Sequence, residues 1–389
     1  MRDTDEDFTS LTIYNLLVEK TIYRWDGYSS IIDYLKNQFS SYHKHVMALK
    51  GYAQRKVLEN HEISVSIQQR IFETVFHYLR GEIPAAYDSM KMAFELTHEI
   101  LIRKSVNGAL SRGHFVFKAR VKKDNAPQQI LRKDMFHIPF EKRHLVADQR
   151  FSAHGIPSVY LGESIYDCYL ELGKPNLDNF LVSLFHIPPE VKLIDLTFSN
   201  HKHDLWLLLH QTNKDNAKYF ATLDKLVDDF LLWPLIMACS IVCRYPEAPF
   251  KQEYIVPQML YQLCNTDTGF NGIKYYSTKI PERDRSKLQN VMINYALPAQ
   301  DIKNAGYCPF LSGRLCLTDP INHTICKDQE VQSSNGYTSI GFPIMNGRLG
   351  DTGNENFIVS LDRMSMYFTN ALMDNYKNAL KPLYEWAEE

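Results

Sequence analysis

The spacing of apolar residues changes near residue 110, and this change constrains the fold more than any other feature of the sequence. Between residues 28 and 104 apolar side chains recur at helical spacing, as in the stripe formed by Ile67, Ile71, Val75 and Tyr78. After the Gly- and Ser-containing stretch 107–113, the run Phe115–Val121 is rich in β-branched and aromatic residues, which favour strands. The chain therefore joins a helical N-terminal part to a part that contains strands.

The remainder of the chain mixes strands and helices without a regular alternation. We expect strands at 157–162, 179–187, 191–197 and in "GIKYYST", and helices in "ESIYDCYLELG", "DLWLLLHQT" and residues 223–242. This order predicts an α+β fold, with a mixed β core and an all-α N-terminal domain. Because 389 residues exceed one ordinary domain, we assign a helical domain to 1–110, the mixed domain to 111–300 and a C-terminal extension to 301–389. The final helix should pack on the core through Phe368, Leu372 and Tyr376.

Composition excludes several classes of protein. The 43 Lys and Arg residues nearly balance the 45 Asp and Glu residues, so no broad basic surface is available for nucleic acid or an acidic membrane. The N-terminal residues lack the order of an export signal, and the most apolar run, Phe230–Cys243, is too short to span a bilayer. We therefore expect a cytoplasmic protein that binds neither membrane nor nucleic acid.

The cysteines indicate no metal site. Seven cysteines form an odd set that suits reduced thiols. Cys308, Cys316, His323 and Cys326 could supply four zinc ligands, but they lack the paired C-x2-C spacing of structural zinc sites. We predict no bound metal.

The segment "DQRFSAHGIPSVYLGESIYDCYLELG" carries the clearest chemical signal. It places Arg150, Tyr160 and Glu171 within an apolar surrounding. If Ser164 caps a helix that follows a strand, Glu171 lies away from the packing face of that helix. A guanidinium, an aromatic ring and a carboxylate together suit a nucleotide-sized ligand. The same three residues could instead be an ion-paired arginine, a core tyrosine and a solvated glutamate.

The order of these motifs resembles the RES domain family, which is named for its Arg, Glu and Ser. The resemblance covers residues 113–300 and rests on Arg150-x9-Tyr160-x10-Glu171, on "FKAR" and "MFHIPFEKR", and on "GIKYYST" with Ser277. It implies an ADP-ribosyltransferase-like fold and an intracellular toxin that destroys NAD by phosphorolysis or hydrolysis. It also implies restraint by an antitoxin or regulatory protein.

The resemblance assigns roles to individual residues. Glu171 would stabilise the oxocarbenium-like ribose, Arg150 would hold phosphate, Tyr160 would stack on nicotinamide, and Ser277 would bond the nicotinamide side or an acceptor phosphate. Further ligand contacts would come from Lys118, Arg120, Ser152 and His137. Lys118 replaces an arginine that is usual in the family and so lacks its bidentate fork. The position of His137 between Phe136 and Pro139 favours a core or edge histidine over a ligand contact. NAD would be the substrate, inorganic phosphate a co-substrate, and no cofactor would be tightly bound.

Three other interpretations stay open at this point. The same site could transfer ADP-ribose to a macromolecule. The element Arg70-x6-His77 resembles the helical motif of HEPN ribonucleases, which would make the N-terminal helices an RNA-cleaving unit. Alternatively, the chain could be a catalytically inactive binding module if Lys118 disables the pocket. Both family resemblances lead us to expect a homo-oligomer.

Overall fold

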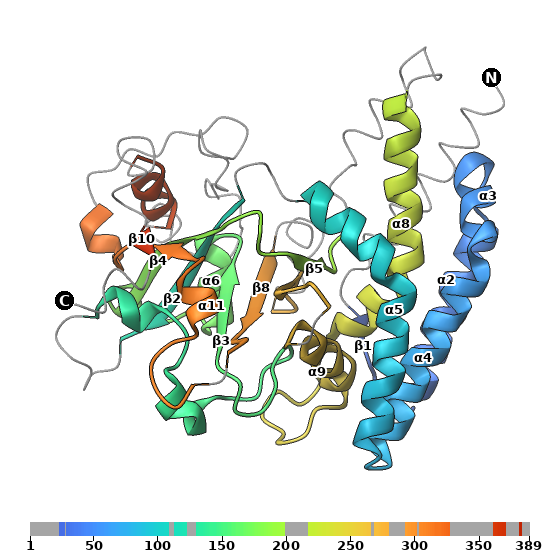
Figure 1. The fold of residues 1–389 in the computed structure, drawn as a ribbon, viewed down its shortest axis with the longest axis horizontal. Coiled ribbons are helices and arrows are strands. Elements are labelled where there is room, and N and C mark those ends of the chain that lie inside the picture. Colours follow the sequence, from blue (N-terminus) through green and yellow to red (C-terminus); the bar gives the residue numbers. More distant parts are fainter. Residues whose placement is uncertain are drawn as a thin grey trace.

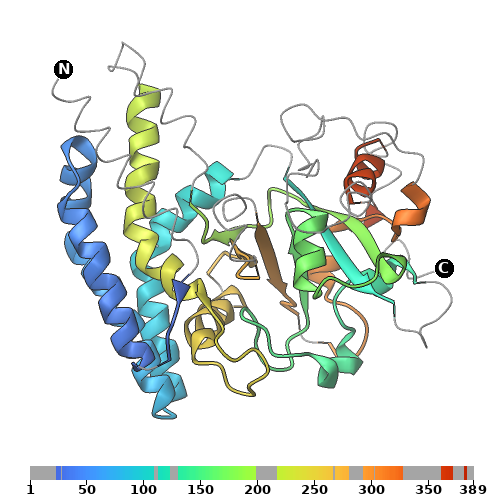
Figure 2. The ribbon, with the colours of Figure 1, turned by 180° about the vertical axis from the view of Figure 1, so that it is seen from behind.

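A layer of long helices stands against a mixed β-sheet (Figures 1 and 2). The computed structural model describes residues 23–27, 29–108, 113–122, 130–198, 217–265, 268–279, 292–301, 303–326, 361–370 and 381–382. The N-terminal part is mainly helical, and the part after residue 113 contains strands and helices. The strands form a two-stranded sheet and an eight-stranded sheet, and the eight-stranded sheet has both parallel and antiparallel neighbours. The predicted α+β class is confirmed.

The N-terminal helices form because their apolar residues recur on one face. They are α2 (Ile31–Met47), α3 (Gly51–Glu59), α4 (His61–Leu79) and α5 (Ile83–Gly108). The first of them starts at Ser30, whose hydroxyl accepts the Asp33 N–H at 3.1 Å. On α4 the predicted stripe is buried at Ile67, Ile71 and Val75, each 0% exposed.

A segment from the middle of the chain completes the helical layer. Helix α8 (Ala217–Cys239) stands beside the N-terminal helices (Figure 1), and its Trp233 stacks on Tyr42 with ring centroids 4.4 Å apart. One continuous cluster of buried residues includes side chains from both regions. The helical layer is therefore built by more than residues 1–110. No helix in the described ranges is both long and apolar enough to cross a bilayer.

Two further elements adjoin the helical layer. Strand β1 (Tyr23–Arg24) pairs in parallel with β6 (Ile241–Val242), directly after α8. Helix α9 (Ile255–Gln262) contacts both α4 and α5 and lies between the helices and the sheet in Figure 1.

The larger sheet has eight strands in the order β10-β9-β4-β2-β3-β8-β7-β5. Neighbouring strands are antiparallel except for the parallel pair of β5 and β7. The bounds are β2 (His114–Val121), β3 (Ser158–Gly162), β4 (Phe180–Ile187), β5 (Leu193–Asp195), β7 (Gly272–Tyr276), β8 (Ile293–Pro298), β9 (Cys316–Leu317) and β10 (Lys381–Pro382). Strand β8, in the interior of the sheet, was not predicted, because "INYALP" contains Asn and Pro, which are poor strand formers.

The sheet opens between its two central strands β2 and β3. Strand β2 pairs with β4 at all eight of its residues but with β3 only at Phe117 and Gly162. Helix α6 (Ile165–Glu171) packs closely over this point, because a Cβ atom on Gly162 would lie only 3.0 Å from Asp167 Cβ and Cys168 Sγ. The predicted cap of α6 is confirmed: Ser164 Oγ accepts the Asp167 N–H at 3.0 Å.

The described residues of the C-terminal part pack on the same sheet. The helix over residues 361–370 contributes Phe368, whose ring lies 5.7 Å from that of Phe117. Leu372, Tyr376 and the segment "DLWLLLHQT" fall outside the described residues. Short helical elements complete the described fold: η1 (Arg132–Met135), η2 (Phe140–Leu145), η3 (Leu177–Asn179), η4 (Gln252–Tyr254), η5 (Leu263–Asn265), α11 (Pro309–Ser312) and η7 (His323–Cys326).

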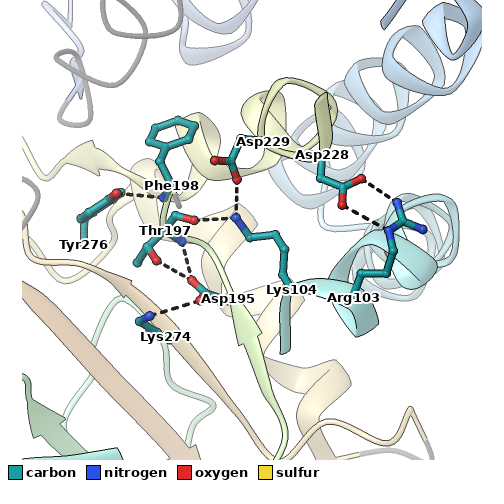
Figure 3. A network of polar contacts seen from close by, with 9 residues as sticks. All are labelled: Arg103, Lys104, Asp195, Thr197, Phe198, Asp228, Asp229, Lys274 and Tyr276. Carbon is teal, nitrogen blue, oxygen red and sulfur yellow. Dashed lines mark hydrogen bonds and ion pairs between the residues drawn. The ribbon is translucent and has the colours of Figure 1, made fainter. Parts of the chain in front are cut away.

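A network of ion pairs and hydrogen bonds lies where the helical layer meets the sheet (Figure 3). Lys104 of α5 pairs with Asp229 of α8 and donates to the carbonyl oxygen of Thr197 at 2.7 Å. The side chains of Lys104 and Asp229 are 7% and 0% exposed. The adjacent pair, Arg103 and Asp228, has a nitrogen–oxygen distance of 2.6 Å, but the arginine side chain is 51% exposed.

The network continues onto strand β7. Asp195 accepts the N–H and hydroxyl of Thr197 at 2.9 and 2.6 Å and forms an ion pair with Lys274 at 3.2 Å. Two residues further along β7, the hydroxyl of Tyr276 accepts the Phe198 N–H at 2.8 Å. Lys274 and Tyr276 thus connect β7 to the network around Lys104.

The two ion pairs should differ in their contribution to stability. Lys104→Met leaves Asp229 buried without its ammonium partner and should lower the free energy of unfolding by about 3–5 kcal/mol. Arg103→Met removes a half-exposed guanidinium from Asp228, whose side chain is 11% exposed and keeps the nearby Lys104 charge, so the loss should be smaller, about 1–2 kcal/mol. Urea unfolding followed by circular dichroism measures both, and equal losses would contradict this account.

Candidate functional site

A cavity of about 610 Å³ opens where β2 and β3 separate. Four of the residues predicted for the site line it: Lys118, Arg150, Tyr160 and Glu171. Its wall also includes polar and aromatic residues that the sequence analysis did not select, namely Gln149, Tyr254, Tyr275, Thr278, Lys279 and Asn294. The opened sheet thus brings charged and aromatic groups around one small-molecule-sized space.

Glu171 occupies a fixed position at the end of α6. Its Oε1 accepts hydrogen bonds from Ser277 Oγ at 2.6 Å and from Asn294 Nδ2 at 2.7 Å. Its Oε2 lies 3.4 Å from Lys279 Nζ, which also donates to the Glu171 carbonyl oxygen at 2.8 Å. The structure therefore brings together Glu171 and Ser277, which are separated by 106 residues. Ser277 itself is fully buried behind the carboxylate.

Arg150 enters the same space with part of its guanidinium unused. One nitrogen donates to Thr278 Oγ1. Its Nε and Nη1 are buried and have no hydrogen-bond partner among the described residues. Burying such donors unpaired costs free energy, and buried donors normally have partners. Two free donors beside a cavity are therefore suited to an anionic ligand.

Lys118 adds a second cation on the β2 side of the cavity. Its Nζ lies 3.4 Å from the carbonyl oxygen of Tyr160. Burial, with a smaller contribution from the nearby Arg120 charge, lowers the pKa of Lys118 to about 8. The amine therefore carries its charge at neutral pH and loses it in mildly alkaline solution.

Three tyrosine rings complete the wall. Tyr160 donates its hydroxyl to the Phe151 carbonyl oxygen at 3.0 Å, which leaves its ring as the group that lines the cavity. Tyr275 packs on Phe151, with ring centroids 4.2 Å apart. Burial raises the pKa of Tyr160 and that of Tyr254, the latter to about 12, so these phenols stay protonated at neutral pH. They offer flat apolar faces for a planar ligand.

Two of the predicted ligand contacts, Arg120 and Ser152, do not line the cavity. Arg120 is exposed and donates to the carbonyl oxygen of Asp134. Ser152 is buried, accepts the Gln149 N–H at 3.0 Å and donates to the Gln149 carbonyl at 2.9 Å. Each side chain forms hydrogen bonds to backbone atoms of the protein and not to the cavity.

His137 lies in the core on the other side of the sheet from α6. It is 2% exposed, and its Nε2 accepts the Cys308 N–H at 2.9 Å. Its Nδ1 lies 2.7 Å from the Ile138 carbonyl oxygen and so acts as the donor. Burial lowers the pKa of His137 to about 4, which keeps the ring neutral. This arrangement fits the core position that the sequence favoured.

Arg70 and His77, the two residues of the HEPN-like element, form ion pairs with different glutamates. Arg70 pairs with Glu73 at 2.6 Å and His77 with Glu82 at 2.7 Å. Within the described ranges, no three His, Cys, Asp or Glu side chains gather as a metal site.

The missed site residues carry weak signals in the sequence. Thr278 and Lys279 directly follow Ser277, and three polar residues after an apolar strand indicate that the chain leaves the core there. Asn294 interrupts an otherwise apolar strand. No local pattern indicates that these residues meet Arg150 and Glu171.

The unpaired guanidinium of Arg150 yields a stability prediction. Arg150→Met keeps most of the aliphatic stem and removes a buried charge with two unpartnered nitrogens. The free energy of unfolding should stay unchanged or rise, as happens when a poorly paired buried charge becomes apolar. The neighbouring Phe151→Ala, at a fully buried site, should lower it by about 3–5 kcal/mol. A loss above about 2 kcal/mol for Arg150→Met, measured by urea unfolding, would show that the guanidinium is structural.

Comparison with known proteins gives one similarity. The chain is 30% identical over 302 residues to a protein of Bacillus subtilis (strain 168) named "Putative toxin YopC". The similar region is 74% of this chain and 65% of that protein, so the chain spans slightly less than two thirds of its relative's length. No family model matches the chain, and no solved structure matches it.

Proposed function

We propose that the chain is an intracellular toxin that cleaves the bond between nicotinamide and ribose in NAD, by phosphorolysis or hydrolysis. The observation that carries this proposal is the cavity in which the Glu171 carboxylate faces the same space as Arg150, Lys118 and the tyrosine rings. Its volume of about 610 Å³ lies within the usual range of small-molecule sites.

The proposed chemistry needs a fixed carboxylate, but it needs no general acid to protonate the leaving group. When the bond between ribose C1′ and the pyridinium nitrogen breaks, its electron pair goes to that nitrogen, and nicotinamide leaves as a neutral molecule. Positive charge develops on the ribose. Glu171 would stabilise this charge, as carboxylates do in glycoside hydrolysis, from a position already set by Ser277.

The remaining groups suit the rest of the substrate. The free nitrogens of Arg150 would bind the pyrophosphate, and Lys118 would add a charge on the opposite wall. Tyr160, Tyr254 or Tyr275 would stack on the nicotinamide ring. An incoming water or phosphate oxygen would form the new bond to C1′ and give ADP-ribose or ADP-ribose-1-phosphate, with a proton released to solvent.

Two independent likenesses support the role as a toxin. One is the similarity to a protein named as a toxin. The other is the ordered match of Arg150, Tyr160, Glu171 and Ser277 to the RES family. Because unrestrained NAD loss would harm the producing cell, we also propose a restraining partner protein.

Product analysis separates the forms of the reaction. The purified chain is incubated with NAD in the presence and absence of phosphate. ADP-ribose-1-phosphate indicates phosphorolysis, ADP-ribose indicates hydrolysis, and ADP-ribosylated protein indicates transfer to a macromolecule. Absence of nicotinamide release in every condition would refute the proposed function.

Glu171→Gln should remove the activity without disturbing the fold. The amide keeps the size of the side chain but cannot stabilise positive charge, so the rate of NAD loss should fall roughly 10²- to 10³-fold. Glu82→Gln, in the helical layer, is the matched control and should retain full activity. Circular dichroism checks that both variants fold, and persistent NAD consumption by Glu171→Gln would refute the role of Glu171.

Lys118 should make substrate binding depend on pH. Because its pKa is about 8, the ammonium form falls from most to a minority of molecules between pH 7 and 9, and KM for NAD should rise roughly tenfold. Lys118→Arg should abolish this dependence, since a guanidinium stays charged throughout that range. A wild-type KM that is constant from pH 7 to 9 would show that Lys118 does not contact the substrate anion.

A further inference from the structure

Asn294 is an unusual residue for its place in the fold. It lies in the interior strand β8 (Ile293–Pro298), between Gly162 of β3 and Tyr275 of β7, and it is 5% exposed. Asparagine is depleted in strands, and a buried amide requires partners. Its amide nitrogen reaches Glu171 Oε1 at 2.7 Å. Because the residue directly opposite is Gly162, no side chain stands between the amide and the end of α6.

The two oxygens of Glu171 have different surroundings. Oε1 accepts from Ser277 and Asn294, whereas Oε2 contacts Lys279, whose side chain is 56% exposed at the cavity. Two donors on one oxygen fix the plane of the carboxylate. Among the described residues, the other oxygen is contacted by a flexible ammonium alone, which a substrate could displace.

The donors on Oε1 have a defined direction. Ser277 Oγ accepts the Lys279 N–H at 3.2 Å, so its own proton is left for Glu171. The amide nitrogen of Asn294 can only donate. Both groups therefore require an oxygen that accepts, and neither changes charge in the physiological range.

We infer that Asn294 is a positioning residue for the proposed cleavage of NAD: together with Ser277 it anchors Oε1 of Glu171, so that Oε2 is directed at the ribose. This inference rests on the proposed function. Asn294 acts through Glu171. Its amide holds the carboxylate in position before the reaction, so that the carboxylate need not reorient in the transition state.

Several charged or titratable groups surround Glu171 and enter its pH dependence. They come from α6, from the start of α9, from β7 and the residues after it, and from the facing cavity wall: Asp167, Cys168, Tyr254, Tyr275, Lys279 and Lys118. A substitution at Asn294 removes none of these side chains. A change in the acid limb of the rate profile can therefore be attributed to position 294.

The decisive variant is Asn294→Asp. It is nearly isosteric and puts a second carboxylate about 2.7 Å from Oε1, where two carboxylates share one proton. The acid limb of the kcat profile should move up by at least one pH unit. Asn271→Asp is the matched control, because Asn271 lies outside the cavity lining and bonds the Lys192 N–H at 3.1 Å. It should leave the profile unchanged.

A second variant keeps the test open if the first does not fold. Asn294→Ala should lower kcat roughly tenfold to hundredfold with little change in KM, because it removes one hydrogen bond to a charged group. Wild-type kcat in Asn294→Ala, or an unmoved acid limb in Asn294→Asp, would overturn the inference.

A spectroscopic readout separates this inference from the proposed function. In protein labelled with 13C at glutamate carboxyl carbons, Glu171→Gln identifies the Glu171 resonance. Its titration midpoint should rise in Asn294→Asp and stay in place in Asn271→Asp. If the midpoint moves but no variant turns over NAD, the proposed reaction is wrong and the anchoring is right. If NAD is consumed and the midpoint is unmoved, the anchoring is wrong.

Discussion

The hydrogen bond between Ser277 and Glu171 is the contact on which the site depends. It joins the end of helix α6 to the end of strand β7 across 106 residues of sequence, at 2.6 Å. The next residue, Thr278, bonds the Arg150 guanidinium, and Lys279 returns to Glu171. Three consecutive residues thus fix a carboxylate and a guanidinium on the wall of one cavity. The cavity exists because β2 and β3 pair at a single position and then separate.

Strand β7 connects this site to the helical layer through hydrogen bonds and ion pairs. Tyr275 lines the cavity, and Ser277 follows the strand to hold the acid. Lys274 and Tyr276, at alternate positions, bond Asp195 and the Phe198 N–H, which belong to the network around Lys104 (Figure 3). Because side chains alternate across a strand, one backbone segment serves the cavity and the buried ion pairs. The helical layer therefore supports the strand that carries the site.

Local patterns predicted the parts of the fold that depend on local physics. The apolar stripe of α4 and the Ser164 cap of α6 follow from helical spacing and from capping chemistry. The packing of α8 against the N-terminal helices was not predictable, since nothing in the sequence indicates that Trp233 stacks on Tyr42. The interior strand β8 was missed because it contains Asn and Pro, which have low strand propensity.

The resemblance to the RES family named residues that the structure brings to one cavity. Arg150, Tyr160, Glu171 and Lys118 share the cavity wall, whereas His137 lies in the core, since nearness in sequence does not determine which face of a sheet a residue occupies. Asn294 depends on strand register, which no local pattern encodes. The most direct measurement of the central claim is nicotinamide release from NAD by the purified full chain. The account predicts catalytic release with ADP-ribose or ADP-ribose-1-phosphate as co-product, abolished in Glu171→Gln; no release with phosphate present, or equal release by that variant, would contradict it.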